Sequence, residues 1–311
     1  MSSVEHPAVR AGAAGDVEVV LALARADEER VTGRPSRLVA GDVRDWWQRV
    51  DLAANSWLVR SPEPGTPVAV TWLEQQGEEL GVSFPITASA ARPELLPLLV
   101  DLVERRAAGL GLARLHVAVL VPDPLAEDLL RGRGYQEVRR FFEMAIELDA
   151  PPPGVALPEG LSLQVVTPAD GRGFHEAISE AFEDHWEHHH QPFEEWWSQR
   201  TSDPDFDLSW WFTVREGGRT VAAIRSVPAR NGGVYVASLG VRRSWRGRGL
   251  AKALLAHTFA WAWQAGFPRI TLGVDASSPT GATQLYRGLG MTVELETAVW
   301  ERRIADTPPS P

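Results

Sequence analysis

The sequence predicts a mixed α/β fold made of two tandem copies of one unit, each a mixed, partly parallel sheet flanked by helices. The first observation is an internal repeat: GLARLHV (111–117) is similar to GFPRITL (266–272), and LLRGRGY (129–135) is similar to LYRGLGM (285–291). The offsets are 266 − 111 = 155 and 285 − 129 = 156 residues. A nearly constant offset over several elements is typical of a duplicated domain.

The second observation is a break near the middle of the chain. Asp149–Gly154 (DAPPPG) has the composition of a stiff linker. A chain of 311 residues also favours two domains on length alone. We therefore expect domains at 1–150 and 151–311, the second ending in a short disordered tail from Thr307.

The expected elements follow the same order in both halves. The first half has a helix within 14–30, strands at 56–60 and 67–73 about a turn at Pro64-Gly65, a helix at 93–108, a strand at 114–120 and a short helix at 124–132. The second half has a helical region within 170–200, strands at 209–215 and 219–227 about Gly217-Gly218, a helix at 248–265, a strand at 269–274 and a short helix at 279–288. An apolar strand after a long helix indicates a crossover and a partly parallel sheet.

Composition excludes several classes of function. The 44% apolar and 23% charged residues are typical of a globular protein with a core. The absence of cysteine excludes disulfides, thiolate metal sites and cysteine nucleophiles. A net charge of −10 argues against nucleic-acid binding. No segment resembles a membrane span or a signal peptide, so we expect a cytoplasmic protein without a membrane partner, either a monomer or a homodimer.

The tetrapeptide RGRG occurs at 131–134 and again at 246–249. The second copy follows a period-2 strand that ends near Val241 and precedes an apolar-periodic helix that starts near Gly249. Glycines at such a junction let the backbone approach a ligand, and the helix adds unpaired N–H groups and a positive dipole end. This construction favours pyrophosphate binding.

The segment Arg246–Ala251 (RGRGLA) fits the pattern [Q/R]-x-x-G-x-[G/A] of the GNAT acyl-CoA N-acyltransferases. Downstream, VDASSPTGATQLYRGLGM (274–291) resembles the second signature of that family. The tandem layout and Ala181-Phe182, His185 and Glu187 also resemble mycothiol synthase-like enzymes, which are tandem GNAT proteins. The resemblance therefore implies two tandem GNAT-like domains.

The first half lacks both signatures. Ala91–Leu96 (ARPELL) aligns with Arg246–Ala251 and has no glycine, and Leu130 aligns with Tyr286. The first RGRG aligns with Arg287–Gly290, which ends the short helix, so its glycines are expected to cap that helix. We therefore expect a degenerate first domain without a phosphate loop and one acyl-CoA site in the second.

The GNAT resemblance implies acetyl-CoA as co-substrate, with its pyrophosphate on backbone N–H groups from Gly247 to Lys252. The pantetheine arm would lie along Leu239, Gly240 and Val241, and an N–H near Leu239 would polarise the thioester carbonyl. The full set of expected cofactor contacts is Leu239, Gly240, Val241, Arg246, Gly247, Arg248, Gly249, Leu250, Ala251, Lys252, Ser278 and Tyr286.

Tyr286 stands where the family places its general acid. The alternative is a packed core aromatic. Two positions depart from the family. Ser278 replaces a frequent asparagine, and Gly232-Gly233 stand where many members carry a glutamate base. A base must then come from elsewhere.

The segment AFEDHWEHHHQPFEEWW (181–197) is the predicted source, with His185 and Glu187 as candidate catalytic residues. It could line the acceptor pocket, form a solvated polar face, or bind a metal through His185 and His189 at i, i+4. No HExxH pattern supports the metal, so none is expected. The tryptophan pairs recur in both halves, which favours packing.

The leading hypothesis is an N-acetyltransferase that acts on the primary amine of a small molecule at one site. A cysteinyl or amino-sugar conjugate is one form that the acceptor could take. The alternatives are a noncatalytic acyl-CoA-binding sensor, a protein lysine or N-terminal acetyltransferase, and the same enzyme with a longer acyl donor.

Overall fold

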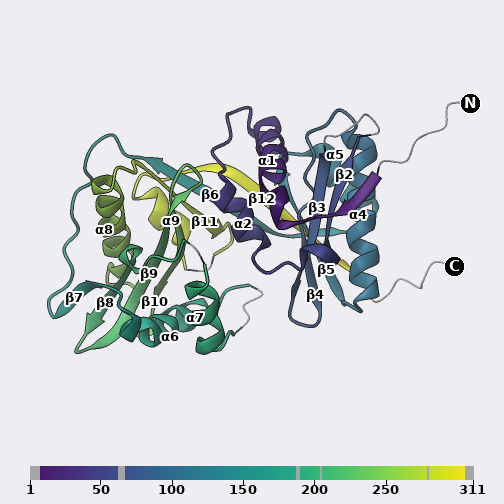
Figure 1. The fold of residues 1–311 in the computed structure, drawn as a ribbon. Helices are drawn as coiled ribbons and strands as arrows, with labels where there is room; N and C mark the ends of the chain where they lie inside the picture. The colour runs from purple at the N-terminus through teal and green to yellow at the C-terminus, as the bar shows by residue number, and fades with distance from the viewer. Residues whose placement is uncertain (1–7, 62–66, 187–189, 204, 279, 305–311) are drawn as a thin grey trace, which may run out of the picture. The chain divides into compact units, whose positions relative to one another are not determined.

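The computed structural model describes residues 8–61, 67–186, 190–203, 205–278 and 280–304. The chain divides into two compact units (Figure 1). Unit 1 comprises Met1–Phe142 and Leu295–Pro311, and unit 2 comprises Glu143–Glu294. Both are α/β structures with a mixed sheet flanked by helices.

The sheet of unit 1 has the strand order β1-β2-β3-β4-β5-β12. Its strands are β1 (Ala8–Ala11), β2 (Ser56–Arg60), β3 (Pro67–Gln76), β4 (Leu80–Ser83), β5 (Arg114–Val121) and β12 (Thr292–Arg303). Strands β4 and β5 are parallel, and the other pairs are antiparallel. Its helices are α1 (Val17–Thr32), α2 (Ala40–Trp47), α3 (Leu52–Asn55), α4 (Arg92–Gly109) and α5 (Pro124–Gly132).

Alternation along the strands of unit 1 separates two apolar layers, because successive side chains of a strand point to opposite faces. Leu58 and Val70 pack with Val20 of α1. Their neighbours Val59 and Ala69 pack with α4. The sheet is therefore covered on both faces, as expected for an α/β unit.

The sheet of unit 2 has the order β6-β11-β10-β9-β8-β7. Its strands are β6 (Gln136–Glu147), β7 (Leu161–Val165), β8 (Trp211–Glu216), β9 (Arg219–Arg230), β10 (Gly233–Val241) and β11 (Arg269–Asp275), with β6 entering at Glu143. Its helices are α6 (Gly171–Phe182), α7 (Phe193–Thr201), α8 (Leu250–Gln264) and α9 (Ala282–Arg287). The β10–β11 pair is parallel.

Helices α8 and α6 cover opposite faces of the unit 2 sheet (Figure 1). Phe212 of β8 lies edge-on to His257 of α8, with ring centroids 4.6 Å apart. On the other face, Gly240 of β10 lies so close to α6 that an added Cβ would be 2.8 Å from the Ala181 Cβ. The absence of a side chain at Gly240 therefore allows α6 to pack closely against the sheet at this point.

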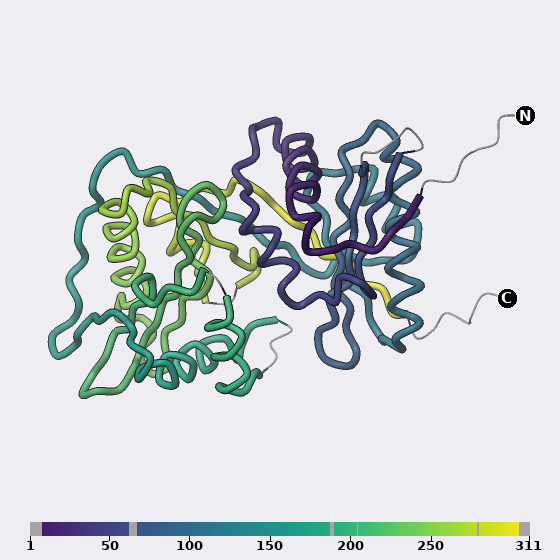
Figure 2. Tube along the Cα trace, viewed as in Figure 1, coloured from purple at the N-terminus to yellow at the C-terminus, as the bar shows by residue number. Residues whose placement is uncertain are grey.

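The two halves of the chain exchange their last strands. Although β6 follows β5 and β12 follows β11, it is β12 that pairs with β5, from Glu296↔Val121 to Arg303↔Arg114. Strand β6 instead lies next to β11. The tube trace in Figure 2 shows the yellow C-terminal segment running alongside the blue strands of unit 1. Unit 1 is therefore discontinuous in sequence and unit 2 is one continuous segment, with boundaries that differ from the expected domains 1–150 and 151–311.

Packing explains why β12 belongs to unit 1. Ala298 and Trp300 are buried in the same apolar cluster as Leu115 and Val117 of β5. In unit 2, the Leu148 N–H donates to the Pro268 carbonyl at 2.8 Å, directly after β6. Because the two final strands are copies of one another, their apolar pattern cannot tell which sheet each one joins.

The first RGRG ends helix α5, as the repeat predicts. Gly134 has φ = 83° and donates to Arg131 O at 3.0 Å. Gly290 has φ = 91° and donates to Arg287 O at the same distance at the end of α9. Both are left-handed helix C-terminal turns, a conformation that favours glycine.

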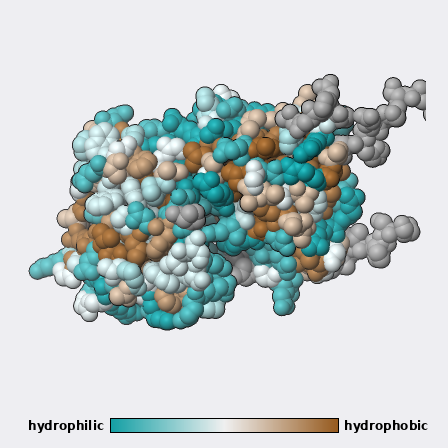
Figure 3. Space-filling model, in the orientation of Figure 1, coloured by the Kyte–Doolittle hydropathy of each residue, from teal (hydrophilic) through white to brown (hydrophobic). Residues whose placement is uncertain are grey.

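The surface drawn in Figure 3 alternates between small hydrophilic and hydrophobic areas. Large apolar side chains that are exposed are few and scattered along the described chain: Val9, Leu125, Val138, Val155 and Val165. Within the described ranges, none of the helices is both long and apolar enough to cross a membrane.

Candidate acyl-CoA site

The strands β10 and β11 separate part of the way along their length. They pair from Val234↔Ile270 to Val236↔Leu272, but β10 continues to Val241 and β11 to Asp275. A bulge between Val236 and Ser238 redirects β10 at this point. Beyond it, β10 still pairs with β9 on its other side, from Leu239↔Ile224 to Val241↔Ala222.

This separation leaves the edge of β10 that faces β11 without a ladder partner over residues 239–241. Backbone groups along an open edge can pair with an added extended ligand. The three residues predicted to hold the pantetheine arm, Leu239, Gly240 and Val241, therefore lie on the segment where the sheet opens.

The predicted phosphate loop connects β10 to α8. Gly247 and Gly249 have φ values of 77° and 80°, which are left-handed and favour glycine. Gly249 is the N-cap of α8, and no side chain caps the helix. Ala253 N–H donates to Gly249 O at 3.0 Å, so the N–H groups of residues 250–252 precede the first helical bond. Leu250 is buried, whereas Gly247, Arg248, Gly249 and Lys252 are exposed.

Arginines that precede the loop are paired with carboxylates of the α6 end. Arg242 is buried, and its Nη1 lies 2.6 Å from Glu180 Oε2. Arg243 Nη2 donates to Asp184 Oδ1 at 2.7 Å. Hydrogen bonding from the Arg243 side chain holds the pKa of Asp184 below its usual range. These charges are therefore largely balanced within the protein.

Arg246 joins the loop to the same helix end. Its Nη2 donates to Ala181 O at 3.1 Å, and its Nη1 lies 3.4 Å from Asp184 Oδ2. Its Nε donates to Val241 O at 3.3 Å. The side chain predicted to contact the cofactor is thus used largely to hold β10, the loop and α6 together.

Arg248 and Trp245 form a contact that sequence reasoning missed. The Arg248 guanidinium carbon lies 4.3 Å from the centre of the Trp245 ring, a cation–π distance. Arg248 Nη2 also lies 3.4 Å from Ser244 O. The spacing i, i+3 in WRGR was the available signal, but nothing in the sequence alone shows that a turn brings the two side chains together.

Tyr286 lies on α9 and is buried, with 9% of its surface exposed. Burial, followed by the nearby phenol of Tyr235, raises its pKa to about 12. No hydrogen bond from its hydroxyl is found among the described residues. A protonated phenol can donate a proton to a ligand, and the roles expected of Tyr286, CoA contact and general acid, remain predictions.

Ser278 lies in the turn between β11 and α9. Its N–H donates to Asp275 O at 3.0 Å, and its hydroxyl lies 2.9 Å from that of Thr280. Within the described part of the chain, no contact joins Ser278 to β10 or to the phosphate loop. Its predicted contact with pantetheine therefore remains a prediction.

The 181–197 segment is described in part. His185 follows α6 directly and stacks on Phe182, with ring centroids 4.2 Å apart. Glu187 and His189 lie outside the described residues. Among the residues that are described, no group of three or more acidic or histidine side chains is arranged to hold a metal ion. His185 thus lies next to Asp184 at the loop-facing end of α6, but the described contacts do not join it to Tyr286.

His175 precedes this segment, in α6, and is buried among Trp196, Phe193 and His190 of the segment. Its Nε2 lies 3.0 Å from Gln191 O, and burial lowers its pKa. The tryptophans of α7 and β8 also pack on one another, with Trp196 and Trp211 5.8 Å apart. These aromatics form packing contacts, in line with the recurrence of tryptophan in both halves.

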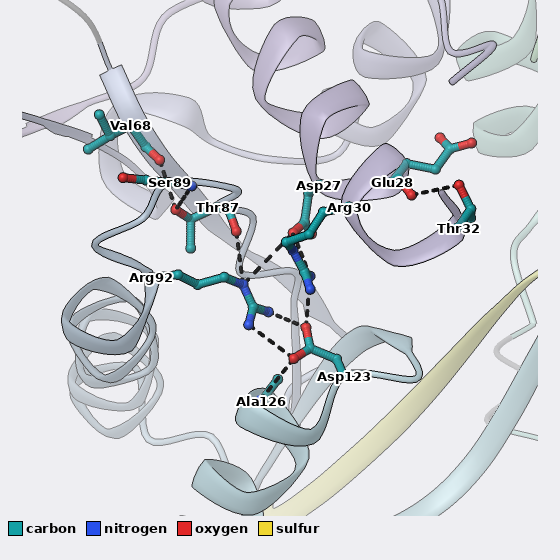
Figure 4. A network of polar contacts seen from close by, with 10 residues as sticks. All are labelled: Asp27, Glu28, Arg30, Thr32, Val68, Thr87, Ser89, Arg92, Asp123 and Ala126. Carbon is teal, nitrogen blue, oxygen red and sulfur yellow. Dashed lines mark hydrogen bonds and ion pairs between the residues drawn. The ribbon is translucent and has the colours of Figure 1, made fainter. Parts of the chain in front are cut away.

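In unit 1, an internal ion-pair network lies at the start of α4, which aligns with the loop of unit 2 (Figure 4). Arg92, the first residue of α4, is buried and bonds both carboxylate oxygens of Asp123. Its Nε donates to Thr87 O at 2.9 Å. Arg30 reaches Asp123 at 2.8 Å and bridges it to Asp27, whose pKa is raised by burial. The segment Ala91–Leu96 thus lacks the glycines of the unit 2 loop, and its Arg92 is paired with an internal carboxylate.

Residues 172–291 match the model of the acetyltransferase (GNAT) family. A mycothiol acetyltransferase of Salinispora tropica is 33% identical over 209 residues, which cover 60% of this chain and 65% of that protein. A mycothiol acetyltransferase of Pseudarthrobacter chlorophenolicus is 30% identical over 176 residues, which cover 54% of each. The matched region thus spans less than two thirds of these relatives.

Solved structures resemble the whole chain. A GCN5-related N-acetyltransferase from Sphaerobacter thermophilus superposes with a TM-score of 0.83 at 29% identity, covering 96% of both chains. A tandem GNAT protein from the clavulanic acid biosynthesis pathway superposes with a TM-score of 0.73 at 16% identity, covering 97% of this chain and 100% of that one. The second likeness concerns the fold alone.

Proposed function

Because the chain carries a domain of the acetyltransferase (GNAT) family at residues 172–291, we propose that it transfers an acetyl group from acetyl-CoA to the primary amine of a small molecule. Unit 2 supplies the donor site. The observation that carries this proposal is the opening of β10 from β11 after Val236, directly upstream of the glycine loop that begins α8. The open edge of β10 can pair with an extended pantetheine arm, and the glycine loop at the start of α8 can bind an anionic group.

In the proposed complex, the diphosphate of CoA binds the N–H groups from Gly247 to Lys252. The pantetheine arm extends along Leu239–Val241 as an added strand. An N–H near Leu239 polarises the thioester carbonyl, where negative charge develops during attack. The neutral amine attacks this carbon, the C–N bond forms, and the C–S bond breaks with its electron pair going to the thiolate.

Tyr286 then gives its proton to the thiolate, and a base removes the proton from the amine. The phenol of Tyr286 stays protonated at neutral pH and so holds a proton to donate; burial, which raises its pKa to about 12, makes it a weaker acid than an exposed tyrosine. We assign the base role to His185, with Glu187 as the alternative from the same segment. His185 sits at the end of α6 that Arg246 ties to the loop. A His185→Gln variant is expected to keep donor binding and lose most turnover near neutral pH.

The acceptor is inferred from the relatives. Two of them are named mycothiol acetyltransferases, and their similarity supports a small-molecule amine over a protein substrate. The amino-sugar or cysteinyl conjugate remains one proposed form of this acceptor. We further propose that unit 1 binds no CoA, because its aligned segment Ala91–Leu96 has no glycine and Arg92 there is paired with Asp123.

A noncatalytic acyl-CoA sensor is the second candidate, and one observation favours it. A side chain at Gly233, where many GNAT proteins carry a base, would lie 2.8 Å from the Arg269 carbonyl carbon. The β10 start therefore has no room for a glutamate. Thiol release with any member of a panel of primary amines would exclude the sensor.

Calorimetric titration of acetyl-CoA tests the donor site. Gly249→Glu is compared with Gly134→Glu, because both glycines have positive φ values (80° and 83°) and open space around the Cβ position. The backbone strain that the substitution causes is therefore matched between the two variants. We expect one site per chain, lost in Gly249→Glu and kept in Gly134→Glu. Two sites would contradict the proposal for unit 1, and no binding to the wild type would contradict the proposed donor.

A further inference from the structure

The arginines around the phosphate loop differ in what they contact. Arg242 and Arg243 pair with carboxylates of α6 and of the turn that follows it, and Arg246 shares Asp184 with Arg243. In the described part of the chain, no carboxylate lies within ion-pair distance of Arg248. The positive charge of Arg248 is therefore not balanced locally, and it lies between the two glycines of the loop.

Arg248 is nevertheless held in place. An exposed arginine normally samples many rotamers, and binding a ligand costs the entropy of fixing it. Here the guanidinium lies over the Trp245 ring at 4.3 Å. Trp245 ends the short 3₁₀ turn Arg243–Trp245, its N–H donates to Arg242 O at 2.8 Å, and it is half-buried. The Trp245 ring is therefore a fixed support for the guanidinium. Without this ring, the Arg248 side chain would be mobile.

The stacking also limits what Trp245 can do directly. One face of the ring is covered by the guanidinium, so that face is not free to stack on the adenine of a nucleotide. The cation is the group that Trp245 presents to the phosphate loop.

We propose that Trp245 is a positioning residue that holds the Arg248 guanidinium ready for the phosphates of CoA. The inference rests on the proposed function and extends it to donor choice. The site selects a donor that carries phosphates, and discriminates against the bare pantetheine arm, through a charge that is ordered before binding. Trp245 itself acts through Arg248.

A double-mutant cycle tests this coupling, because residues that act through one another are not additive. CoA binding is measured by calorimetry at low salt for the wild type, Trp245→Leu, Arg248→Met and the double variant. Arg248→Met is expected to weaken binding about tenfold, the loss of one charge-assisted contact. Trp245→Leu is expected to weaken it about threefold, the scale of an exposed cation–π pair. The double variant should bind no more weakly than Arg248→Met.

Two controls separate positioning from structure. Trp245→Phe keeps a ring under the guanidinium and should bind CoA within about twofold of the wild type. Pantetheine, which lacks phosphates, should show no difference among the variants. Melting temperatures check folding, and Trp245→Gln replaces Trp245→Leu in the cycle if the leucine variant unfolds.

Additive losses in the double variant would overturn the inference, since they would mean that the two side chains act independently. Unchanged affinity in a folded Trp245→Leu protein would overturn it as well. Failure of the wild type to bind CoA is a different result, because it removes the proposed donor and this inference together.

Discussion

Arg246 donates a hydrogen bond from Nη2 to the carbonyl oxygen of Ala181 at 3.1 Å, which joins the phosphate loop to the end of α6. In the proposed reaction the loop holds the donor, and the segment that follows α6 supplies the base. One arginine therefore connects the two sides of the site. Arg246 also pairs with Asp184, and the negative charge of this carboxylate lowers the positive potential at the loop.

Asp184→Asn is expected to strengthen CoA binding about two- to threefold at low salt. The substitution removes a carboxylate from Arg243 and Arg246 and raises the positive potential at the loop. The gain should shrink at high salt, because the charges involved are exposed and screened. Calorimetry at two salt concentrations measures both effects. Glu159→Gln, on an exposed segment before β7, carries the same change in net charge and should leave the affinity unchanged.

Tyr286→Phe is expected to lower kcat about 10²-fold or more, in the range of general acid catalysis, with little change in the Kd of acetyl-CoA. The ring stays in place and keeps its packing, while the proton donor is lost. Steady-state thiol release measures kcat, and calorimetry measures the Kd of acetyl-CoA. If kcat is unchanged, Tyr286 is a packed aromatic and the thiolate takes its proton from another source.

The same residue should make stability fall at alkaline pH. An unfolded tyrosine loses its proton near pH 10, whereas Tyr286 in the fold has a pKa of about 12. Between these values the unfolded state ionises first, so the free energy of unfolding decreases as pH rises from about 10 to about 12. Below pH 10 the contribution is fully present. Denaturant unfolding of the wild type should show a steeper alkaline decline than Tyr286→Phe, and equal slopes would contradict burial of the phenol.

Gly240→Ala is expected to destabilise unit 2 by about 1–3 kcal/mol, the usual cost of overpacking. The added Cβ would lie 2.8 Å from the Ala181 Cβ and 3.0 Å from the Ile178 Cδ1, so α6 would have to move off the sheet. Hydrogen exchange in α6 and β10, together with thermal melting, reports the change. Gly154→Ala has open space around the Cβ and serves as the matched substitution, for which no loss is expected.

The strand exchange predicts how the chain can be cut. A fragment of residues 143–294 contains all of unit 2, whereas residues 151–311 lack the β6 segment and carry β12 without its unit 1 partner. The first fragment should fold cooperatively. The second should be aggregation-prone, since the apolar side chains of Ala298 and Trp300 would be exposed on an unpaired strand. Circular dichroism and size-exclusion chromatography of both fragments check this, and a well-folded 151–311 fragment would contradict it.

Local patterns predicted most of the fold, because helices and strands follow from periodicity and from glycine position. The helices at 93–108 and 124–132 and the strand at 269–274 lie within one residue of the observed α4, α5 and β11 at each end. The helix-capping role of the first RGRG could also be predicted, since RGRG aligns with Arg287–Gly290 at the end of the second short helix. The hairpin turn predicted at Pro64-Gly65 lies outside the described residues.

What could not be predicted depends on contacts between distant residues. The repeat shows that β6 and β12 are equivalent, but not which sheet each joins, because both carry the apolar pattern that either sheet requires. Likewise, Arg246 matches a cofactor-binding motif, yet its guanidinium contacts Ala181 and Asp184, more than 60 residues away in sequence. Charge pairing across such separations has no local signature.

The exchanged strands also constrain how this protein can evolve. In a plain end-to-end duplication, a deletion could remove either copy and leave the other intact. Here residues 8–142 and 295–304 flank unit 2 and belong together, so unit 2 is in effect an insertion within a host domain. Deleting the first half of the sequence, residues 1–150, would remove β6 from the sheet of unit 2 and leave β12 without its partner β5. A cut at the boundary of the sequence repeat therefore damages both units, whereas cuts at residues 143 and 294 leave unit 2 whole.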